Sequence, residues 1–418
     1  MASIQYWVKL LLKFVSVQLV VQVLGFSSGI LIINSLSKTD YSYYLLANTM
    51  QFTMDLMADF GITIGLNSIG GKIWQDRTKI SQLIATAFAI RSYLITASII
   101  VVLPILFVLL FNNGASLPTI ILLTCAVLLE LQFYSTNKIL GTVPRLNSNI
   151  NLIQKLDFIL ALTRLFGLLG AYLLGINVVI ATFCSTFASG IYSLLLSRWV
   201  RDKIDLHSSI DIEYRSQILK LIKSQFLPTA FYCLQGQITI WIITIFGQTS
   251  GISEIGALSR LGLILTIINP VINSIIVPSY ARCQSIDLLK KRYWQLITIF
   301  MIISGCLLVL VSIFSGQLLW ILGKQYAHLG NELTLVMVSS LITSLTTMIW
   351  GLNYAKAWVI QSWTIIPSTI AMQILLVFCL DLTTVRDTII FGLFSAVPPL
   401  VMNLYMSNRG MKMMSKSI

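Results

Sequence analysis

Long apolar runs separated by short polar loops fill almost the whole of the 418-residue chain. A helix needs about 20 consecutive apolar residues to cross the hydrocarbon core of a bilayer. Runs such as 99–110 do not alternate apolar with polar positions, so the pattern indicates helices rather than strands. The predicted crossings are 14–36, 42–66, 84–111, 117–137, 156–175, 177–197, 226–247, 255–278, 295–322, 333–354, 358–380 and 388–407.

Two of the divisions between these runs are short. The one after the fifth run rests on Gly175, Ile176 and Asn177 alone, and the other lies around Lys356. With both accepted, the predicted fold class is an all-α membrane protein with about twelve transmembrane helices in two six-helix lobes. The predicted domains are an N-terminal lobe, 1–197, a cytoplasmic amphipathic linker, 198–225, and a C-terminal lobe, 226–418.

The distribution of positive residues predicts the orientation, because Lys and Arg accumulate in short cytoplasmic loops. With the N-terminus inside, 22 of the 28 Lys and Arg fall in cytoplasmic loops, 3 fall outside and 3 lie within apolar runs. This partition predicts cytoplasmic N- and C-termini and a multi-pass protein of the cell (inner) membrane. The net charge of +13 then follows from topology, with anionic membrane lipids as its partner and no nucleic acid.

The remaining chemistry argues against an enzyme. Hydrophobic residues make up 56% of the chain and charged residues 10%, which excludes a soluble enzyme. The six cysteines form no Cys-x-x-Cys pair and the two histidines stand on loops of opposite sides, so we expect no metal site. No phosphate-binding loop occurs, and the outer loops hold no catalytic constellation. We therefore expect no catalytic residues and no cofactor, with transport driven by an ion gradient, the membrane potential or the substrate's own gradient.

Six charged residues fall well within predicted crossings, away from their ends. A charge at the bilayer centre costs about 2.5 to 3.5 kcal/mol even on a mild insertion scale. Six such charges facing lipid would exceed the typical stability of a folded protein, about 5 to 15 kcal/mol. They must therefore line water or pair with one another, and three acids balance three arginines. The six are Asp55, Asp59, Arg91, Glu130, Arg164 and Arg260.

Uncharged polar residues recur at helical spacing beside some of these charges, which predicts a polar interior for the N-terminal lobe. The stripes are Gln18 and Gln22 on the first helix, Asn48, Gln51, Asp55 and Asp59 on the second, and Glu130, Tyr134 and Asn137 on the fourth. Two interpretations stay open. The acids neutralise the arginines in a structural network, or the charges form a site for substrate and coupling cation. Gly61-x-x-x-Gly65 indicates a close-packing notch.

The chain resembles a known family at several short motifs. Leu36-Ser-Lys-Thr-Asp40-Tyr-Ser-Tyr and Asp59-Phe-Gly-Ile-Thr-Ile-Gly65 are similar to the opening of polysaccharide-unit flippases of the O-antigen type, within the multidrug/oligosaccharidyl-lipid/polysaccharide exporter superfamily. The second lobe adds further motifs. These are Ile255-Gly-Ala-Leu-Ser-Arg260, Asn269-Pro270, Pro278-Ser-Tyr-Ala-Arg282 and Ile321-Leu-Gly-Lys-Gln-Tyr326.

The resemblance implies two lobes that alternate access to a cavity for undecaprenyl diphosphate-linked oligosaccharide. The guanidinium groups of Arg91 and Arg164 suit diphosphate oxygens. Asp55 and Asp59, with Glu130 as the next candidate, are expected to couple transport to a cation, proton or sodium. The substrate-binding residues expected on this interpretation are Arg91, Arg164, Arg260, Gln18, Gln22 and Asn48.

Other interpretations remain. The first alternative is an ion-coupled drug or metabolite antiporter of the same superfamily. A major-facilitator transporter is favoured less, because the loop Gly71-Lys-Ile-Trp-Gln-Asp76-Arg77 has one residue too many between Gly and Asp and lacks the trailing Gly. A scaffold without transport activity is a further alternative. The sequence does not name the sugar, the coupling ion or the oligomeric state.

Overall fold

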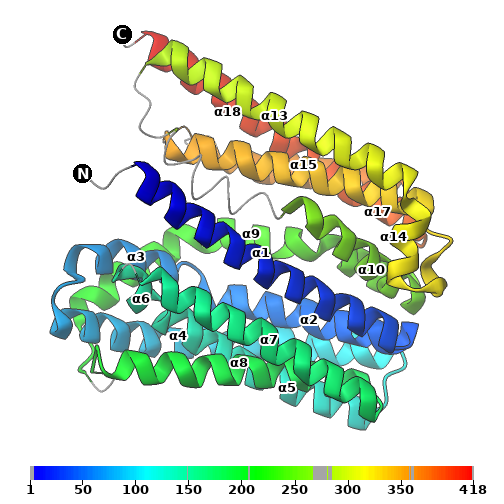
Figure 1. The fold of residues 1–418 in the computed structure, drawn as a ribbon, viewed down its shortest axis with the longest axis horizontal. Coiled ribbons are helices and arrows are strands. Elements are labelled where there is room, and N and C mark those ends of the chain that lie inside the picture. The colour runs from blue at the N-terminus through cyan, green and yellow to red at the C-terminus, as the bar shows by residue number, and fades with distance from the viewer. Residues whose placement is uncertain are drawn as a thin grey trace. The chain divides into compact units, whose positions relative to one another are not determined.

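The computed structural model describes residues 4–147, 149–205, 208–266, 280, 285–356, 358 and 362–416. Every regular element within these residues is a helix, which confirms the predicted all-α fold class. The chain divides into two compact units, drawn in Figure 1 from blue to red along the sequence. Unit 1 is Met1–Gln237 and unit 2 is Ile238–Ile418.

Unit 1 contains helices that pack along their lengths. α5 packs against α8, α7 against both α1 and α8, and α2 against α4 and α5. Figure 1 shows α5, α7 and α8 running side by side. The helices are α1 (Ile4–Ser35), α2 (Lys38–Asp59), α3 (Ile62–Ile73), α4 (Arg77–Asn112), α5 (Leu117–Leu140), α6 (Thr142–Leu146), α7 (Ile150–Leu174), α8 (Val178–Arg201) and the first part of α9 (Ile212–Phe246).

Unit 2 is organised around α15 (Gly330–Ala355), which packs against α10, α13, α17 and α18. A small apolar core formed by Ile242, Leu376, Leu382 and Phe391 joins the end of α9 to α16 and α17. The other helices are α10 (Thr249–Thr266), α13 (Ile286–Ile313), α14 (Ser315–Leu322), η2 (Lys324–Tyr326), η3 (Ser362–Thr364), α16 (Ile365–Cys379), α17 (Val385–Ser395) and α18 (Val397–Lys416).

The helices have the length and surface of a multi-pass membrane protein. Within the described residues, eight are long and apolar enough to cross a bilayer. Large apolar side chains such as Leu174 and Phe378 are 89% and 85% exposed. Lipid covers such surfaces at no cost, whereas water does not. Each of the twelve predicted runs overlaps a described helix, although 255–278 is described only as far as Thr266, and Asn269-Pro270 lies outside the described residues.

The short division after the fifth run is confirmed. α7 ends at Leu174, and Gly175 follows with a φ of 94°, a conformation that favours glycine. Asn177 then caps α8, because its side chain accepts a hydrogen bond from the Ile180 N–H at 2.9 Å. Polar caps at this and other junctions explain how closely spaced apolar runs become separate helices.

Some predicted crossings are not single helices. The run 42–66 is interrupted where Phe60 has a φ of 30° and Gly61 a φ of 96°, so α2 stops and α3 starts anew. The run 295–322 breaks at Phe314, between α13 and α14. The run 388–407 breaks at Ala396, so that Pro398 and Pro399 fall in the first turn of α18, where a helix tolerates proline best.

The segment 198–225 includes the last turn of α8 and the first part of α9, which continues without a break to Phe246. Ile218 and Ile222 of its apolar stripe are buried in the core of unit 1, whereas Ile210 is 53% exposed. A Cβ built on Gly65 of α3 would lie 3.4 Å from Leu221, which is ordinary contact. Alanine would therefore fit at Gly65, and Gly61 forms the turn that starts α3, so the packing notch stays a prediction.

Candidate functional site

Five of the six intramembrane charges predicted from the sequence lie together in unit 1. We call Asp55, Asp59, Arg91, Glu130 and Arg164 the charge network. α2 carries the two aspartates, and α4, α5 and α7 carry one residue each. Helices α2, α4 and α5 pack against one another in pairs, and a hydrogen bond from Arg164 to Tyr44 links α7 to α2. The fold thus brings together side chains that are more than 100 residues apart in the chain.

Two carboxyl groups sit near the middle of the network. Asp55 is 6% exposed, and its Oδ1 has no hydrogen-bond partner in the described structure. Glu130 lies within electrostatic range of Asp55, and Gln51, one turn before Asp55, is within hydrogen-bonding range of both. Like charges held this close repel, so the pair favours carrying a proton or a bound cation.

Arg91 supplies the most deeply buried positive charge. Its side chain is 1% exposed, and none of its three guanidinium nitrogens has a hydrogen-bond partner within the described structure. It interacts electrostatically with Asp59 and Asp55. An isolated buried guanidinium costs several kcal/mol, and these carboxylates offset part of that cost. Because its donors are unused, Arg91 can bond to an anion or to a rearranged carboxylate.

The remaining charges have direct partners. Glu130 Oε1 accepts a hydrogen bond from Ser189 Oγ of α8 at 2.5 Å, and Arg164 contributes favourable electrostatic attraction. Arg164 Nη2 donates to the buried Tyr44 hydroxyl at 2.8 Å, while its Nε is buried without a partner. Arg164 thus has a direct partner that Arg91 lacks, while Glu130 and Asp55 each keep one buried oxygen, Oε2 and Oδ1, without a hydrogen-bond partner in the described structure.

Asp59 and Asn48 also have local structural roles. Asp59 Oδ1 accepts hydrogen bonds from the Thr63 N–H at 3.0 Å and the Thr63 hydroxyl at 2.8 Å. These bonds hold the first turn of α3 across the break after α2. Asn48 Nδ2 donates to the Tyr44 carbonyl oxygen one turn earlier, at 2.9 Å. Both side chains are therefore engaged within their own segment of chain.

The other predicted site residues lie outside this cluster. Gln18 and Gln22 are on α1, the first partly buried and the second exposed. Arg260 is on α10 of unit 2 and is partly buried there. Of the two histidines, His328 contacts Glu254 in unit 2 at 3.4 Å, and His207 lies outside the described residues. Roles for these residues in substrate binding stay predictions.

Tertiary structure adds partners that the sequence did not indicate. Tyr44 follows the same one-turn spacing as Asn48, so its position on α2 was a usable signal. Ser189, and Thr186 within range of Glu130, are ordinary hydroxyl residues of an apolar helix. Only the packing of α8 against α5 shows that these two hydroxyls meet Glu130.

The arrangement suits reversible binding of small cations. It mixes partnered and unpartnered charges in a low-dielectric interior, where a proton or sodium ion changes the energy by several kcal/mol. The guanidinium groups offer sites to anionic oxygens.

Comparison with known proteins identifies the fold. No family model matches the chain, and no curated protein matches its sequence. A solved inward-facing conformation of a multidrug resistance MATE family transporter of the MOP superfamily is similar, with a TM-score of 0.75 and 17% identity over 96% of this chain and 99% of that one.

A MATE structure in complex with MaD3S is also similar, with a TM-score of 0.67 and 17% identity over 98% of this chain and 96% of that one. A MOP superfamily transporter from Pyrococcus furiosus, described as having a binding pocket of reversed polarity, has a TM-score of 0.67 and 17% identity over 96% and 95%. The chain therefore has the fold of MOP superfamily transporters.

Proposed function

We propose that this protein is a cation-coupled membrane transporter that moves undecaprenyl diphosphate-linked oligosaccharide units across the cell membrane by alternating access. The observation that carries the coupling role is the buried Asp55, whose Oδ1 lacks a partner while a second carboxyl group, Glu130, lies within electrostatic range. A site of this kind gains free energy when a proton or sodium ion binds. The transporter fold supports the proposal at the level of architecture.

Coupling requires that cation binding change the electrostatic attractions between the residues of the charge network. When a cation neutralises Asp55, the attraction between Asp55 and Arg91 weakens, so the Arg91 guanidinium is released toward other acceptors. Release of the cation restores that attraction. Two charge arrangements of similar energy, one for each occupancy, are what alternation between conformations needs.

The arginines support an anionic substrate. Arg91 has three unpartnered nitrogens and Arg164 a buried, unpartnered Nε, so both retain donors for phosphate oxygens. The motifs shared with polysaccharide-unit flippases favour a lipid-linked diphosphate over other anions. On this proposal, the diphosphate replaces the carboxylates as the acceptor for one or both guanidinium groups.

A drug antiporter is the second candidate, and the shared transporter fold supports it equally well. Two of the similar solved structures are named as multidrug resistance MATE family transporters. A cationic drug would compete with the coupling cation for Asp55 and Glu130, and the arginines would then serve as counter-ions. The two candidates share the coupling site and differ in the sign of the substrate charge.

Transport in proteoliposomes separates the candidates. Lipid-linked oligosaccharide and a cationic dye are tested separately, each with an imposed pH or sodium gradient and without one. We expect gradient-driven translocation of the lipid-linked substrate, its loss in Asp55→Asn, and no change in the exposed control Glu213→Gln. Movement of the dye alone would support the antiporter. A parent protein that ignores every gradient would contradict coupling.

A further inference from the structure

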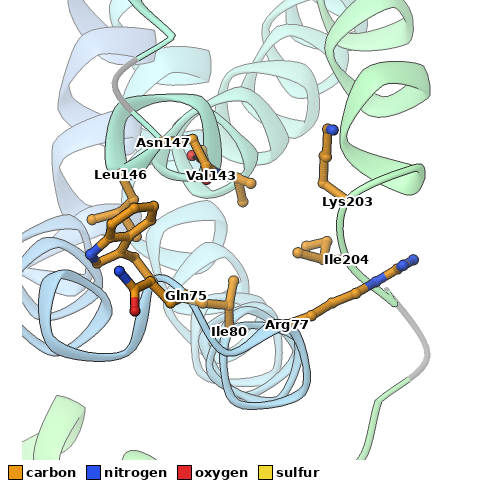
Figure 2. A pocket seen from close by; sticks show the side chains of 9 residues that line it. Gln75, Arg77, Ile80, Val143, Leu146, Asn147, Lys203 and Ile204 are labelled. Atoms are coloured by element: carbon orange, nitrogen blue, oxygen red, sulfur yellow. Dashed lines mark hydrogen bonds between the residues drawn. The ribbon is translucent and has the colours of Figure 1, made fainter.

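A pocket at one end of unit 1, away from the charge network, presents positive charge around an apolar floor. Its volume is about 170 Å³, and Figure 2 shows it between the start of α4, the α6 segment and the loop after α8. The floor is made by Ile80, Val143 and Ile204, which are 4%, 1% and 3% exposed. Arg77 and Lys203 line the same pocket, and Gln75 and Asn147 add side-chain amides.

The walls of the pocket are fixed by specific contacts. The loop that carries Lys203 is held to α8 by a hydrogen bond from its own N–H to the Val200 carbonyl at 2.8 Å. It is held to α4 by a bond from the Asp205 N–H to Ser81 Oγ at 2.9 Å. Opposite, α3 approaches α6 so closely that a Cβ on Gly70 would lie 2.6 Å from Leu146. A pocket with such walls is preformed, which reduces the entropy cost of binding a ligand.

Within the described structure, neither Arg77 nor Lys203 forms a salt bridge with an acidic side chain. Asp76, the nearest acid in sequence to Arg77, accepts from the N–H groups of Thr78 and Lys79 at 3.1 Å each and pairs with the Lys79 ammonium at 3.5 Å. The N-terminus of α4 is therefore already capped. Lys203 lies 5.9 Å from the ring centre of Trp199, a contact that leaves its N–H donors available.

We propose that this pocket binds the phosphate group of an anionic glycerophospholipid of the cytoplasmic leaflet. Two cations match the phosphate, and the apolar floor matches the glycerol region beside it. The volume equals that of about five or six water molecules, enough for a headgroup phosphate and adjoining glycerol atoms but not for a nucleotide. Trp74, also in the lining, is 45% exposed, and tryptophan favours the membrane interface.

The predicted topology supports a lipid source over a soluble one. The loops that contribute Arg77 and Lys203 are among the basic loops assigned to the cytoplasmic side, where anionic lipids are enriched. A phosphate diester on a lipid is delivered by the membrane at high local concentration, whereas inorganic phosphate is not. The inference is independent of which substrate the protein transports.

The test uses the purified full-length protein in detergent, titrated with phosphatidylglycerol and followed by native mass spectrometry of the first bound lipid. We expect Arg77→Gln combined with Lys203→Gln to weaken that binding by roughly tenfold, the effect of removing charge-assisted hydrogen bonds to a phosphate. The matched control is Arg215→Gln with Lys220→Gln, which removes the same charge from exposed positions of α9. It should change binding by less than about twofold, because exposed charges contribute little.

A filling variant separates the pocket from general surface charge. Asn147→Trp places a large ring at the exposed rim and keeps both cations, so it should also weaken binding of phosphatidylglycerol. Equal loss in the control pair, or full binding by the filled variant, would overturn the assignment of this pocket. Equal binding of phosphatidylcholine would overturn the preference for an anionic lipid. Complete competition by inorganic phosphate or glycerol phosphate would overturn the lipid source.

Discussion

Each unit contains a buried polar cluster, and the two clusters differ in how completely their hydrogen bonds are satisfied. In unit 2, Asn353, Asn403 and Ser407 are at most 1% exposed and bond to one another. Asn353 Nδ2 donates to the Asn403 carbonyl at 2.9 Å, and Ser407 Oγ donates to Asn353 Oδ1 at 2.7 Å. We call these three residues the amide cluster. In unit 1, the charge network contains a 1% exposed Arg91 whose guanidinium nitrogens lack hydrogen-bond partners.

The contrast suggests that the amide cluster stabilises the fold, whereas the charge network serves function. A neutral cluster with satisfied hydrogen bonds fixes the packing of α15 against α18 and has little reason to rearrange. Buried charges with open donors and acceptors cost stability, and proteins keep them where binding or switching uses them. We therefore expect substitutions in the charge network to affect transport more than stability, and substitutions in the amide cluster to do the reverse.

The largest expected effect is on transport in unit 1. Asp55→Asn and Arg91→Gln should each reduce gradient-driven transport by about 100-fold, the upper range for losing one charge-assisted interaction. Melting temperature in detergent should stay near that of the parent, because each change removes a poorly solvated charge. The double variant should be no worse than either single variant, since the two residues act together. A parallel loss of folded protein would instead identify the pair as structural.

The second effect is on stability in unit 2. Asn353→Leu should lower the free energy of unfolding by about 2 to 4 kcal/mol, because it removes the bonds of the Asn353 amide and leaves Asn403 Oδ1 buried without its donor, while Ser407 Oγ keeps only its bond to the Asn403 carbonyl. Ser407→Ala should cost less, since Asn353 keeps its own donor bond. Thermal unfolding in detergent measures both. Loss of transport at unchanged stability would show that the amide cluster is also part of the mechanism.

The residues of the charge network could be predicted from the sequence, whereas those of the amide cluster could not, and the reason is physical. A charge in an apolar run is expensive wherever it points, so Arg91 and Glu130 stood out without any structure. A single Asn in an apolar helix costs much less and pairs in many ways, and nothing about Asn353 alone indicated Asn403, 50 residues away. The predicted crossings were similarly reliable because apolar length is a strong signal.

Helix breaks were less predictable than helices. Gly175 and Asn177 mark a break that the sequence anticipated, because glycine and a capping residue coincide there. The break at Phe60 was missed, since an aromatic residue with a φ of 30° is unusual, and only the following Gly61 gave a signal. That break gives Asp59 its bond to Thr63, so the aspartate that the sequence assigned to coupling also holds the first turn of a helix.

A third effect tests close packing, which both units use. In unit 2, a Cβ on Gly262 of α10 would clash with Ser340 Oγ of α15. Gly262→Val should therefore destabilise unit 2 by about 1 to 3 kcal/mol through overpacking. In unit 1, a Cβ on Gly190 would lie 3.2 Å from the Phe133 ring, so Gly190→Ala should cost less. Thermal unfolding of the two variants compares them, and a larger loss for Gly190→Ala would contradict this order.

The smallest expected effect concerns exposed acids, which should behave alike in the two units. The pKa of Asp76 in unit 1 is lowered, chiefly by the Lys79 backbone N–H that its side chain caps. The pKa of Asp381 in unit 2 is lowered, chiefly by the Thr383 hydroxyl. A carboxyl group whose pKa falls on folding stabilises the protein above its unfolded pKa of about 3.9 and loses that contribution as pH falls through the folded value.

Asp76→Ala and Asp381→Ala should therefore lower the melting temperature slightly at pH 7, by less than Gly262→Val does. The deficit relative to the parent should stay constant down to about pH 4 and shrink below it, as the parent's own carboxylates become protonated. Melting curves from pH 7 to the acid limit of the detergent-solubilised protein measure this. A deficit that shrinks between pH 7 and pH 5 would mean that a group with a higher pKa is involved. In that case the substitutions would also have changed the protonation of a buried acid, which Asp76 and Asp381 are not expected to influence.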